Sequence, residues 1–323
     1  MRILSGIQPS GALHIGNYFG AIRQYIELEK GNEAFYFVAD YHALTSVRSA
    51  AMLRQYVFDV LVDLLSLGLD PAKATLFVQS DVPETTELAW LLTTVTPMGW
   101  LEKAVSFKEK VQQGLPAEHG LFAYPVLQAA DILLYDSDLV PVGQDQKQHL
   151  EITRDIAERF NRVYGGDQEV FRLPKAYILE NTAVVPGLDG RKMSKSYNNT
   201  IEIFDEPAAI RKKVKRIVTD STPVEAPKNP DTCSLFTLFR LFAPADELTE
   251  VERRYREGGI GYGEMKTRLA EAIIERFAAA RQQRADWVAH PERVAEVRAA
   301  AAARARAAAR TVLDRAREAC GVG

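Results

Sequence analysis

The sequence predicts an α/β fold followed by an all-helical C-terminal region. In the first half of the 323-residue chain, short β-rich runs alternate with longer helical patterns, which is typical of a parallel sheet covered by helices. Beyond about residue 204 the strand signals vanish and helical periodicity continues. With 47% hydrophobic residues the chain can bury a substantial core, and its length favours about two domains.

Amphipathic segments separate the apolar runs of the first half and are expected to form crossover helices. Residues 52–67 carry apolar side chains at helical spacing, and a second helix begins within residues 83–93. This alternation predicts a Rossmann-like parallel-sheet domain that binds a nucleotide. Its strands are expected at residues 2–5, 34–39, 75–79 and 139–142.

The C-terminal part is expected to consist of helices alone. The tail over residues 292–320 is rich in Ala and Arg, which are strong helix formers, and it is expected to be an ordered last helix. Other helical segments are residues 207–217, 234–242 and 265–288.

Three units follow from this pattern. We expect the last helix to pack back on the first unit. The expected units are a catalytic domain over residues 1–184, a loop and linker over 185–200, and a helical domain over 201–323.

Composition limits the cellular setting. No apolar run approaches the roughly 20 residues needed to cross a bilayer, and the first residues lack the features of a signal peptide. Cys233 and Cys320 are far apart and the five histidines are dispersed, so no structural metal site is expected. These observations predict a cytoplasmic protein without membrane contact. The net charge of −3 means that any contact with nucleic acid requires a local basic patch.

A glycine-rich run, Gly6-Ile7-Gln8-Pro9-Ser10-Gly11, follows the first predicted strand, and His14-Ile15-Gly16-Asn17 then opens a helix. Such a turn lets backbone N–H groups and the positive end of a helix approach phosphate. The His14 imidazole and the Asn17 amide add donors for charge on phosphate oxygens. The alternative is that the glycines only permit a tight turn.

A second motif, Lys192-Met193-Ser194-Lys195-Ser196, lies in the polar stretch 187–200 between the expected domains. Two lysines on a mobile loop can close over a triphosphate and neutralise the departing pyrophosphate. Taken alone, the motif also fits a solvated basic loop.

The order of the two motifs resembles the joint signature of the class I aminoacyl-tRNA synthetases, an HIGH-like element near the N-terminus and a downstream KMSKS. Asn17 stands where the usual fourth residue is histidine, but asparagine is familiar there among the tryptophanyl enzymes. The resemblance implies that His14, Asn17, Lys192 and Lys195 are catalytic. It also implies ATP contacts by Asn17, Lys192, Lys195, Gln8, Pro9, Ser10, Gly16, Val185, Met193, Ser194 and Ser196.

Residues 124–133 predict a helix on which Tyr124, Gln128 and Asp131 share one face. The indole N–H of tryptophan can only donate a hydrogen bond, so a tryptophan site needs a buried acceptor, and a carboxylate is the strongest one. Asp131 is the candidate. The alternative is a helical aspartate that faces solvent.

The run 142–149 follows a predicted strand and leads into a helix over residues 150–161. Ligands bind at strand ends in open α/β sheets, where Gly143 allows close approach and Asp145 can hold a ribose hydroxyl. An ordinary polar helix start fits the run equally well. By resemblance, Gly143, Gln144 and Asp145 contact ATP, and Gln146 contacts the amino acid.

These segments, together with the run 261–266, resemble the tryptophanyl-tRNA synthetases in particular, over residues 2 to about 277. Gln128 and Leu4 stand where many bacterial members have Met and Phe, which leaves the fine shape of the pocket open. The resemblance implies a tryptophan pocket made by Asp131, Tyr124, Gln128, Gln146, His42 and Leu4.

Two of these assignments have ordinary structural alternatives. His42 is equally compatible with a structural histidine. The run 107–110 resembles a phosphate-facing segment, which implies an ATP contact by Lys110 and a neighbouring role for Lys108, although a charge run is usually a solvated face.

A basic helix face is the candidate RNA contact. Ile210, Val214 and Ile217 fall on one face of a helix, which leaves a cluster of cations toward solvent that suits phosphate. A solvated face without a partner is the alternative. The cluster comprises Arg211, Lys212, Lys213, Lys215 and Arg216.

The resemblance implies a tryptophan–tRNA ligase that converts L-tryptophan and ATP with Mg²⁺ to tryptophanyl-adenylate. The 3′-terminal adenosine of tRNA(Trp) is then acylated, and the enzyme is a homodimer. A tyrosyl-tRNA synthetase is the nearest alternative, because a phenol O–H also satisfies a carboxylate. Further alternatives are a small nucleotidyltransferase with an HIGH motif and a catalytically silent synthetase paralogue.

Overall fold

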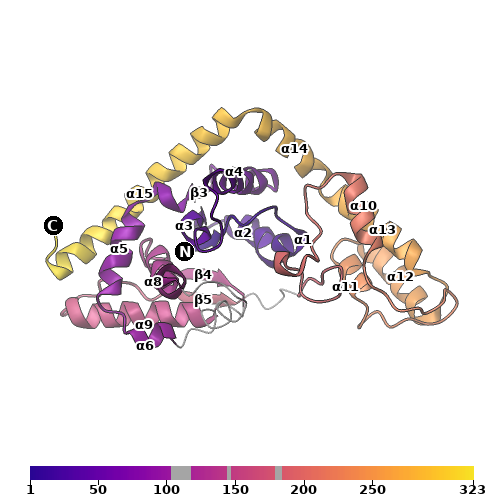
Figure 1. The fold of residues 1–323 in the computed structure, drawn as a ribbon, viewed down its shortest axis with the longest axis horizontal. Helices are drawn as coiled ribbons and strands as arrows, with labels where there is room; N and C mark the ends of the chain where they lie inside the picture. The colour runs from indigo at the N-terminus through magenta and orange to yellow at the C-terminus, as the bar shows by residue number, and fades with distance from the viewer. Residues whose placement is uncertain (103–117, 144–146, 179–183) are drawn as a thin grey trace.

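The computed structural model describes residues 1–102, 118–143, 147–178 and 184–323. The molecule is elongated, with a sheet covered by helices at one end and a group of helices at the other (Figure 1). Helices α14 (Ala278–Ala289) and α15 (Pro291–Cys320) run from the helical group back across the sheet region. No helix in the described ranges combines the length and the apolar character needed to span a membrane.

Within the described ranges, the sheet has five parallel strands in the order β3-β2-β1-β4-β5. This is the order of a Rossmann-like sheet, so the predicted α/β fold with a helical C-terminal region is confirmed. The prediction missed the fifth strand, which has only four residues and starts with a lysine at the sheet edge. The strands are β1 (Arg2–Ile7), β2 (Glu33–Val38), β3 (Ala74–Val78), β4 (Leu139–Val142) and β5 (Lys175–Ile178).

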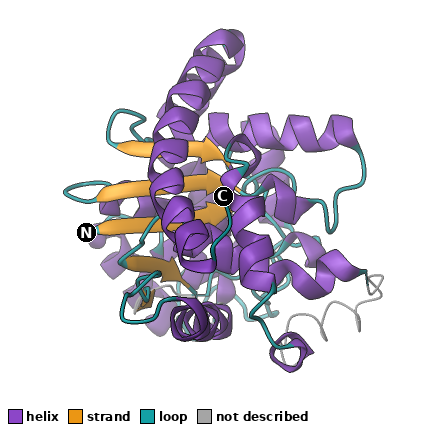
Figure 2. Cartoon of the chain, turned by 90° about the vertical axis from the view of Figure 1, so that its left-hand side faces the viewer, coloured by secondary structure: helices purple, strands orange, loops and turns teal. Residues whose placement is uncertain are grey.

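Helices connect these strands and cover both faces of the sheet (Figure 2). The two longest of them in the first half are α4 (Ala50–Ser66) and α9 (Lys147–Tyr164). The others are α1 (Ile15–Asn17), the π-helical turn η1 (Tyr18–Ile22), α2 (Arg23–Leu28), α3 (Asp40–Ala43), the 3₁₀ turn η2 (Gln79–Asp81), α5 (Glu84–Thr93), α6 (Met98–Glu102) and α8 (His119–Leu133).

The alternation of side chains along the strands produces two apolar cores. Tyr36 and Val38 of β2 belong to the core under α4, which continues into the C-terminal helical group through Met193. Phe35 and Phe37 of the same strand belong to the core on the other face, beneath α5, α8, α9 and α15. Both faces are therefore buried, which explains why the strands are nearly continuous apolar runs.

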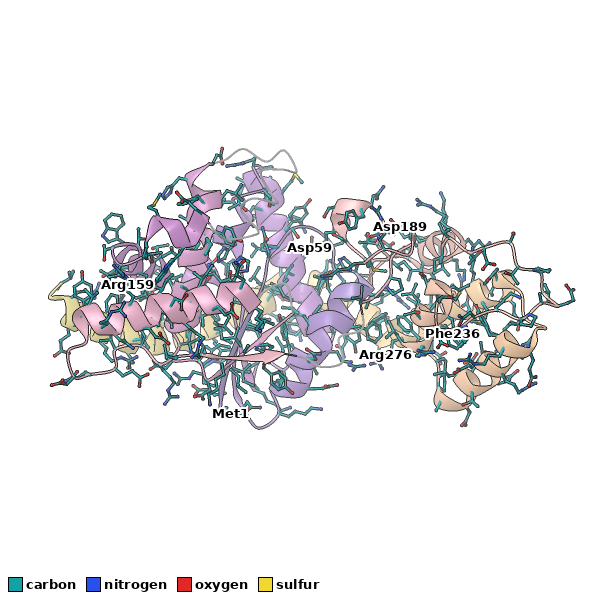
Figure 3. All side chains as sticks on the ribbon, turned by 90° about the horizontal axis from the view of Figure 1, so that it is seen from below. Met1, Asp59, Arg159, Asp189, Phe236 and Arg276 are labelled. Atoms are coloured by element: carbon teal, nitrogen blue, oxygen red, sulfur yellow. The ribbon has the colours of Figure 1, made fainter. Side chains whose placement is uncertain are left out.

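The C-terminal group differs from the prediction in two details. Residues 265–288, expected as one helical segment, are divided at Phe277 between α13 and α14, and residues 245–257 form a helix that was not predicted. Figure 3 shows the aromatic Phe236 within this group of helices. The group contains α10 (Pro207–Lys215), α11 (Ser234–Arg240), α12 (Ala245–Glu257) and α13 (Tyr262–Arg276).

The last helix lies against β3 and α5. Its buried face consists largely of alanines at a spacing of four residues, Ala301, Ala305 and Ala309, which allow close approach of the helix backbone. Arginines beside this face pair with acidic side chains of the sheet region, including Arg315 with Asp136 at 2.6 Å. The expected domain limits at residues 184 and 200 stay a prediction.

Candidate active site

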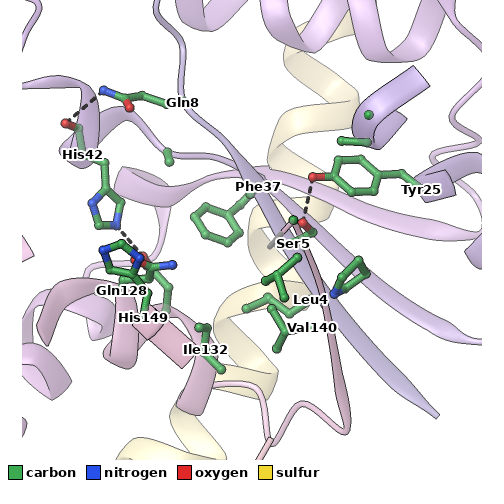
Figure 4. Close-up of a pocket in the computed structure, with 18 of the residues that line it drawn as sticks. Leu4, Ser5, Gln8, Tyr25, Phe37, His42, Gln128, Ile132, Val140 and His149 are labelled. Atoms are coloured by element: carbon green, nitrogen blue, oxygen red, sulfur yellow. Dashed lines mark hydrogen bonds and ion pairs between the residues drawn. The ribbon is translucent and has the colours of Figure 1, made fainter. Parts of the chain in front are cut away.

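A cavity of about 400 Å³ opens at the carboxyl ends of β1 and β4 (Figure 4). These two neighbouring strands lie where the chain order of the sheet reverses, and open α/β sheets bind ligands at this point. Strand β1 contributes Leu4 to Gly6, and β4 leads into Gly143. Helix α8 forms the opposite wall, so the fold alone brings three segments distant in sequence to one cavity.

Asp131 is the most enclosed charged group of the cavity, with 2% of its surface exposed. The Nε2 of His42 lies 2.8 Å from its Oδ2, and the Nε2 of Gln79 donates to both carboxylate oxygens at 2.8 and 2.9 Å. Burial raises the pKa of Asp131, while these two partners act to lower it. The helical aspartate thus faces the interior, and the alternative of a solvent-facing side chain is wrong.

Most residues expected around an amino acid lie together in this cavity. His42, which is bonded to Asp131, lies beside Tyr124. The hydroxyl of Tyr124 is 2.6 Å from the Nε2 of His149. Gln146 lies outside the described residues. The expected residues that line the cavity are Leu4, His42, Tyr124, Gln128 and Asp131.

The ring of Phe37 forms one wall of the cavity, and it has room there because residue 6 is a glycine. A Cβ at Gly6 would lie 2.5 Å from Cζ of Phe37, so any side chain at this position would displace the ring. Ile132 from α8 and Val140 from β4 add apolar side chains to the walls, which also carry polar groups (Figure 4). An aromatic ring and apolar side chains beside one buried carboxylate suit an aromatic ligand that carries a hydrogen-bond donor.

The turn after β1 and the lysine motif lie in direct contact. The Nζ of Lys195 donates to the carbonyl oxygen of Gly11 at 2.8 Å and lies 3.4 Å from the hydroxyl of Ser10. The backbone φ of Gly11 is +113°, a conformation that favours glycine. Two segments separated by more than 180 residues therefore meet where the sequence predicted that they would share a nucleotide.

His14 and Asn17 form the start of α1. The backbone N–H of His14 donates to the Oδ1 of Asn17 at 3.0 Å, which closes a capping box. A Cβ at Gly16 would lie 2.9 Å from the Nδ1 of His14, so the glycine leaves room for the ring. Burial, assisted by the charge of Lys195, lowers the pKa of His14 to about 4, so its imidazole is neutral at neutral pH.

Asn199, which the sequence did not single out, organises the lysine loop. It is 2% exposed, and its Oδ1 accepts from the N–H of Ser194 at 2.8 Å. Its Nδ2 donates to Asp189 at 2.7 Å and to the carbonyl of Lys192 at 3.2 Å. Asp189 lies between the sheet region and the helical group (Figure 3). One buried amide thereby holds the first and the middle residue of the KMSKS segment.

Replacing Asn199 by alanine is expected to lower the free energy of unfolding by about 1–3 kcal/mol and to slow pyrophosphate exchange about tenfold. The reason is that the backbone groups of Lys192 and Ser194 lose their buried partner. Denaturant unfolding and the exchange rate measure the two effects. The matched control is Asn229→Ala, in an exposed turn where the side chain accepts one local bond at 2.9 Å; equal losses in both variants would contradict the role of Asn199.

The remaining expected nucleotide contacts differ in their surroundings. Lys192 is exposed, whereas Met193 and Val185 are buried and joined by a backbone bond of 2.8 Å. Gln8 lies 3.3 Å from the carbonyl of His42. The remaining expected contacts in the described ranges are buried Pro9, partly exposed Gly143 and exposed Ser196, whose hydroxyl lies 3.0 Å from that of Ser194. Lys108, Lys110, Gln144 and Asp145 lie outside the described residues.

The expected basic face of α10 is only partly available to a partner. Lys213 forms ion pairs with Glu202 and, at 2.6 Å, with Asp205, so the prediction that it faces solvent is wrong. Arg211 binds Glu271 at 2.7 and 3.0 Å. The sequence showed the cations of this helix but not the acidic residues that fold against them. Lys212, Lys215 and Arg216 remain exposed.

No group of three or more potential metal-binding side chains was found among the residues that the structure describes. The charged group that contacts the carbonyl oxygen of Gly11 in the turn after β1 is the ammonium of Lys195.

Many enzymes bind nucleotides on a parallel sheet, but this chain also places a KMSKS lysine against the turn after the first strand, so that the two motifs of the class I aminoacyl-tRNA synthetase signature meet. The model of the family described as tRNA synthetases class I (W and Y) matches residues 1–278. The chain belongs to this family and is an aminoacyl-tRNA synthetase.

Relatives and solved structures extend the similarity over the whole chain, including the Ala/Arg tail. The tryptophan–tRNA ligase of Rhodopirellula baltica is 56% identical, with 100% of both chains covered, and that of Fusobacterium nucleatum is 50% identical, covering 99% of this chain and 98% of the relative. The crystal structure of the tryptophanyl-tRNA synthetase of Campylobacter jejuni with ADP and tryptophan matches with a TM-score of 0.93, 46% identity and full coverage of both chains.

Proposed function

We propose that this synthetase is a tryptophan–tRNA ligase, which activates L-tryptophan with ATP and transfers it to tRNA(Trp). The observation that carries the proposal is the buried carboxylate of Asp131 in a cavity whose other walls include Phe37, Ile132 and Val140. An indole ring presents one N–H donor on an otherwise apolar surface, so a buried acceptor beside apolar side chains matches its single polar group. Relatives that are 50% and 56% identical over nearly their whole length carry the same name.

In the first step, the carboxylate of tryptophan attacks the α-phosphate of ATP, and pyrophosphate leaves. No protein nucleophile is needed, so the enzyme acts by positioning the reactants and stabilising charge. The turn after β1 and Asn17 hold the nucleotide. Lys195 already lies at this turn, and Lys192 is free to approach the leaving group. Magnesium enters with ATP as part of the substrate.

The neutral state of His14 shapes its role at the same turn. Since its pKa is lowered to about 4, the imidazole adds no positive charge at neutral pH and acts through hydrogen bonding alone. The charge that meets the phosphates is therefore supplied by the lysine loop, and this division of roles agrees with a loop that closes during the reaction.

In the second step, the 2′-hydroxyl of the terminal adenosine of tRNA(Trp) attacks the adenylate. The helical group, with Lys212, Lys215 and Arg216 exposed, supplies the surface for RNA phosphates. We further propose a homodimer in the cytoplasm. Both cysteines are unpaired thiols, which agrees with a reducing compartment.

Pyrophosphate exchange measured with each amino acid separately tests the choice of substrate. Exchange is expected with tryptophan and not with tyrosine at equal concentration. Tyrosine also carries one donor, but its ring is smaller and its hydroxyl sits at a different point than the indole N–H. Exchange that depends on tyrosine alone would overturn the proposal in favour of the sister activity.

A further inference from the structure

Gln79, the residue directly after β3, contacts two elements that carry polar residues of the cavity. Its Nε2 donates to both oxygens of Asp131, and its Oε1 accepts from the backbone N–H of Tyr41 in α3 at 3.1 Å. A backbone N–H can only donate, so this bond fixes the amide with its nitrogen toward Asp131. Gln79 is 1% exposed and does not line the cavity, so it reaches a ligand only through Asp131.

The turn η2 that carries Gln79 is also tied to the last helix. Asp81 of this turn accepts two bonds of 2.7 Å from Arg298 of α15. Between Gln79 and Asp81, the backbone N–H of Ser80 donates to Asp40 at 3.0 Å. Asp40 begins the helix that carries His42. One three-residue turn therefore connects α15, α3 and α8.

We propose that Gln79 is a positioning residue for amino-acid selection, and that Arg298 on the last helix sets its position through Asp81. The inference rests on the proposed function, because it concerns how Asp131 is presented to the indole N–H. A carboxylate accepts about four hydrogen bonds. Among the described residues, Gln79 and His42 occupy three of these positions and leave acceptor capacity on Oδ1.

Gln79 donates to both oxygens of Asp131, and this arrangement has a consequence that a single hydrogen bond would not have. His42 alone holds one oxygen, and the carboxylate could still turn about its Cβ–Cγ bond. With Nε2 of Gln79 bound to both oxygens, the plane of the group is fixed before a ligand arrives. Preorganisation of this kind strengthens binding without adding a contact to the ligand.

The first test replaces Gln79 by leucine, which has a similar shape and no donor. We expect the KM for tryptophan in pyrophosphate exchange to rise about tenfold while kcat stays within about twofold. The bonds from Gln79 help to keep Asp131 ionised, so their loss raises the pKa of Asp131 further. As the pH falls, the KM of the variant should therefore begin to rise at a higher pH than that of the wild type.

This pH profile separates positioning from damage to the fold. Partial unfolding lowers kcat at every pH and does not move the profile. An unchanged KM together with an unchanged profile in Gln79→Leu would overturn the proposal. Gln79→Glu, which keeps the shape but places a second carboxylate beside Asp131, is expected to impair tryptophan binding more than leucine does.

The second test compares two arginines of the same helix. Arg298→Ala should raise the KM for tryptophan about threefold, since the turn loses a bidentate partner. Arg306→Ala is the matched control, because Arg306 pairs with Glu84 of α5, which Arg310 also holds and which does not line the cavity. An equal rise in both variants would show a general effect of helix docking and would overturn the role of Arg298.

The wild-type enzyme separates this inference from the proposed function. If wild-type exchange requires tyrosine in place of tryptophan, the proposed function fails. If wild-type exchange requires tryptophan but Gln79→Leu matches the wild type in KM and pH profile, only the positioning inference fails.

Discussion

Replacing Lys195 by alanine is expected to lower kcat for pyrophosphate exchange by about 10²–10³, the equivalent of about 3–4 kcal/mol of transition-state stabilisation. Lys195 is the loop cation that already contacts the turn after β1, through the carbonyl of Gly11 at 2.8 Å. It is partly buried, which lowers its pKa and places its charge in a medium less screened than bulk water. The KM for tryptophan should change little, because Lys195 does not line the cavity around Asp131.

The rate of adenylate formation in a single turnover measures this effect directly. Lys195→Arg keeps the charge and should recover part of the rate. Lys212→Ala removes an exposed lysine of α10 and should leave exchange unchanged, since exchange needs no tRNA. A Lys195→Ala enzyme with wild-type kcat would show that the lysine acts only in holding the loop.

Replacing Asp131 by alanine is expected to reduce kcat/KM for tryptophan by about 10² or more, from a loss of about 3 kcal/mol. The variant removes the acceptor for the indole N–H and also leaves partly buried His42 and buried Gln79 without their partner. The loss should appear mainly in KM for tryptophan, whereas the KM for ATP should stay near its wild-type value. Pyrophosphate exchange at varied tryptophan and ATP concentrations measures both.

Asp131→Ala also tests selectivity. Without the carboxylate, the cavity distinguishes amino acids by shape alone, so the ratio of kcat/KM for tryptophan to that for phenylalanine should fall. Thermal unfolding recorded beside the assay separates an altered pocket from an unfolded one. A folded variant with normal tryptophan turnover would remove Asp131 from the substrate contacts.

The strands were predictable where apolar runs are long and bounded by polar residues. β1 to β4 were each located to within two residues, because both faces of the sheet are covered and each run is nearly all apolar. β5 was missed because Lys175–Ile178 is short and lies at the sheet edge, where one side needs no partner strand. The presence of helices was predicted better than their ends, as the break between α13 and α14 at Phe277 shows.

Residues of the site were predictable when they belong to a local pattern. Asp131 and Tyr124 share a helix face, and Lys195 belongs to a five-residue motif, so spacing alone marked them. Gln79 and Asn199 carry no such pattern. Their importance comes from partners 52 and 5–10 residues away, which only the fold brings within hydrogen-bond distance. The prediction that the cations of α10 all face solvent was partly wrong for the same reason, because Glu271, the partner of Arg211, lies 60 residues away in the sequence.

The alanine-lined face of α15 bears on how the protein is made. Residues 291–320 supply the outer cover of β3 and α5, yet they are synthesised long after these two elements. During translation β3 and α5 keep part of their apolar surface open to water until residues 291–320 have left the ribosome. A nascent chain halted near residue 290 would expose this surface, which makes it a natural binding target for chaperones.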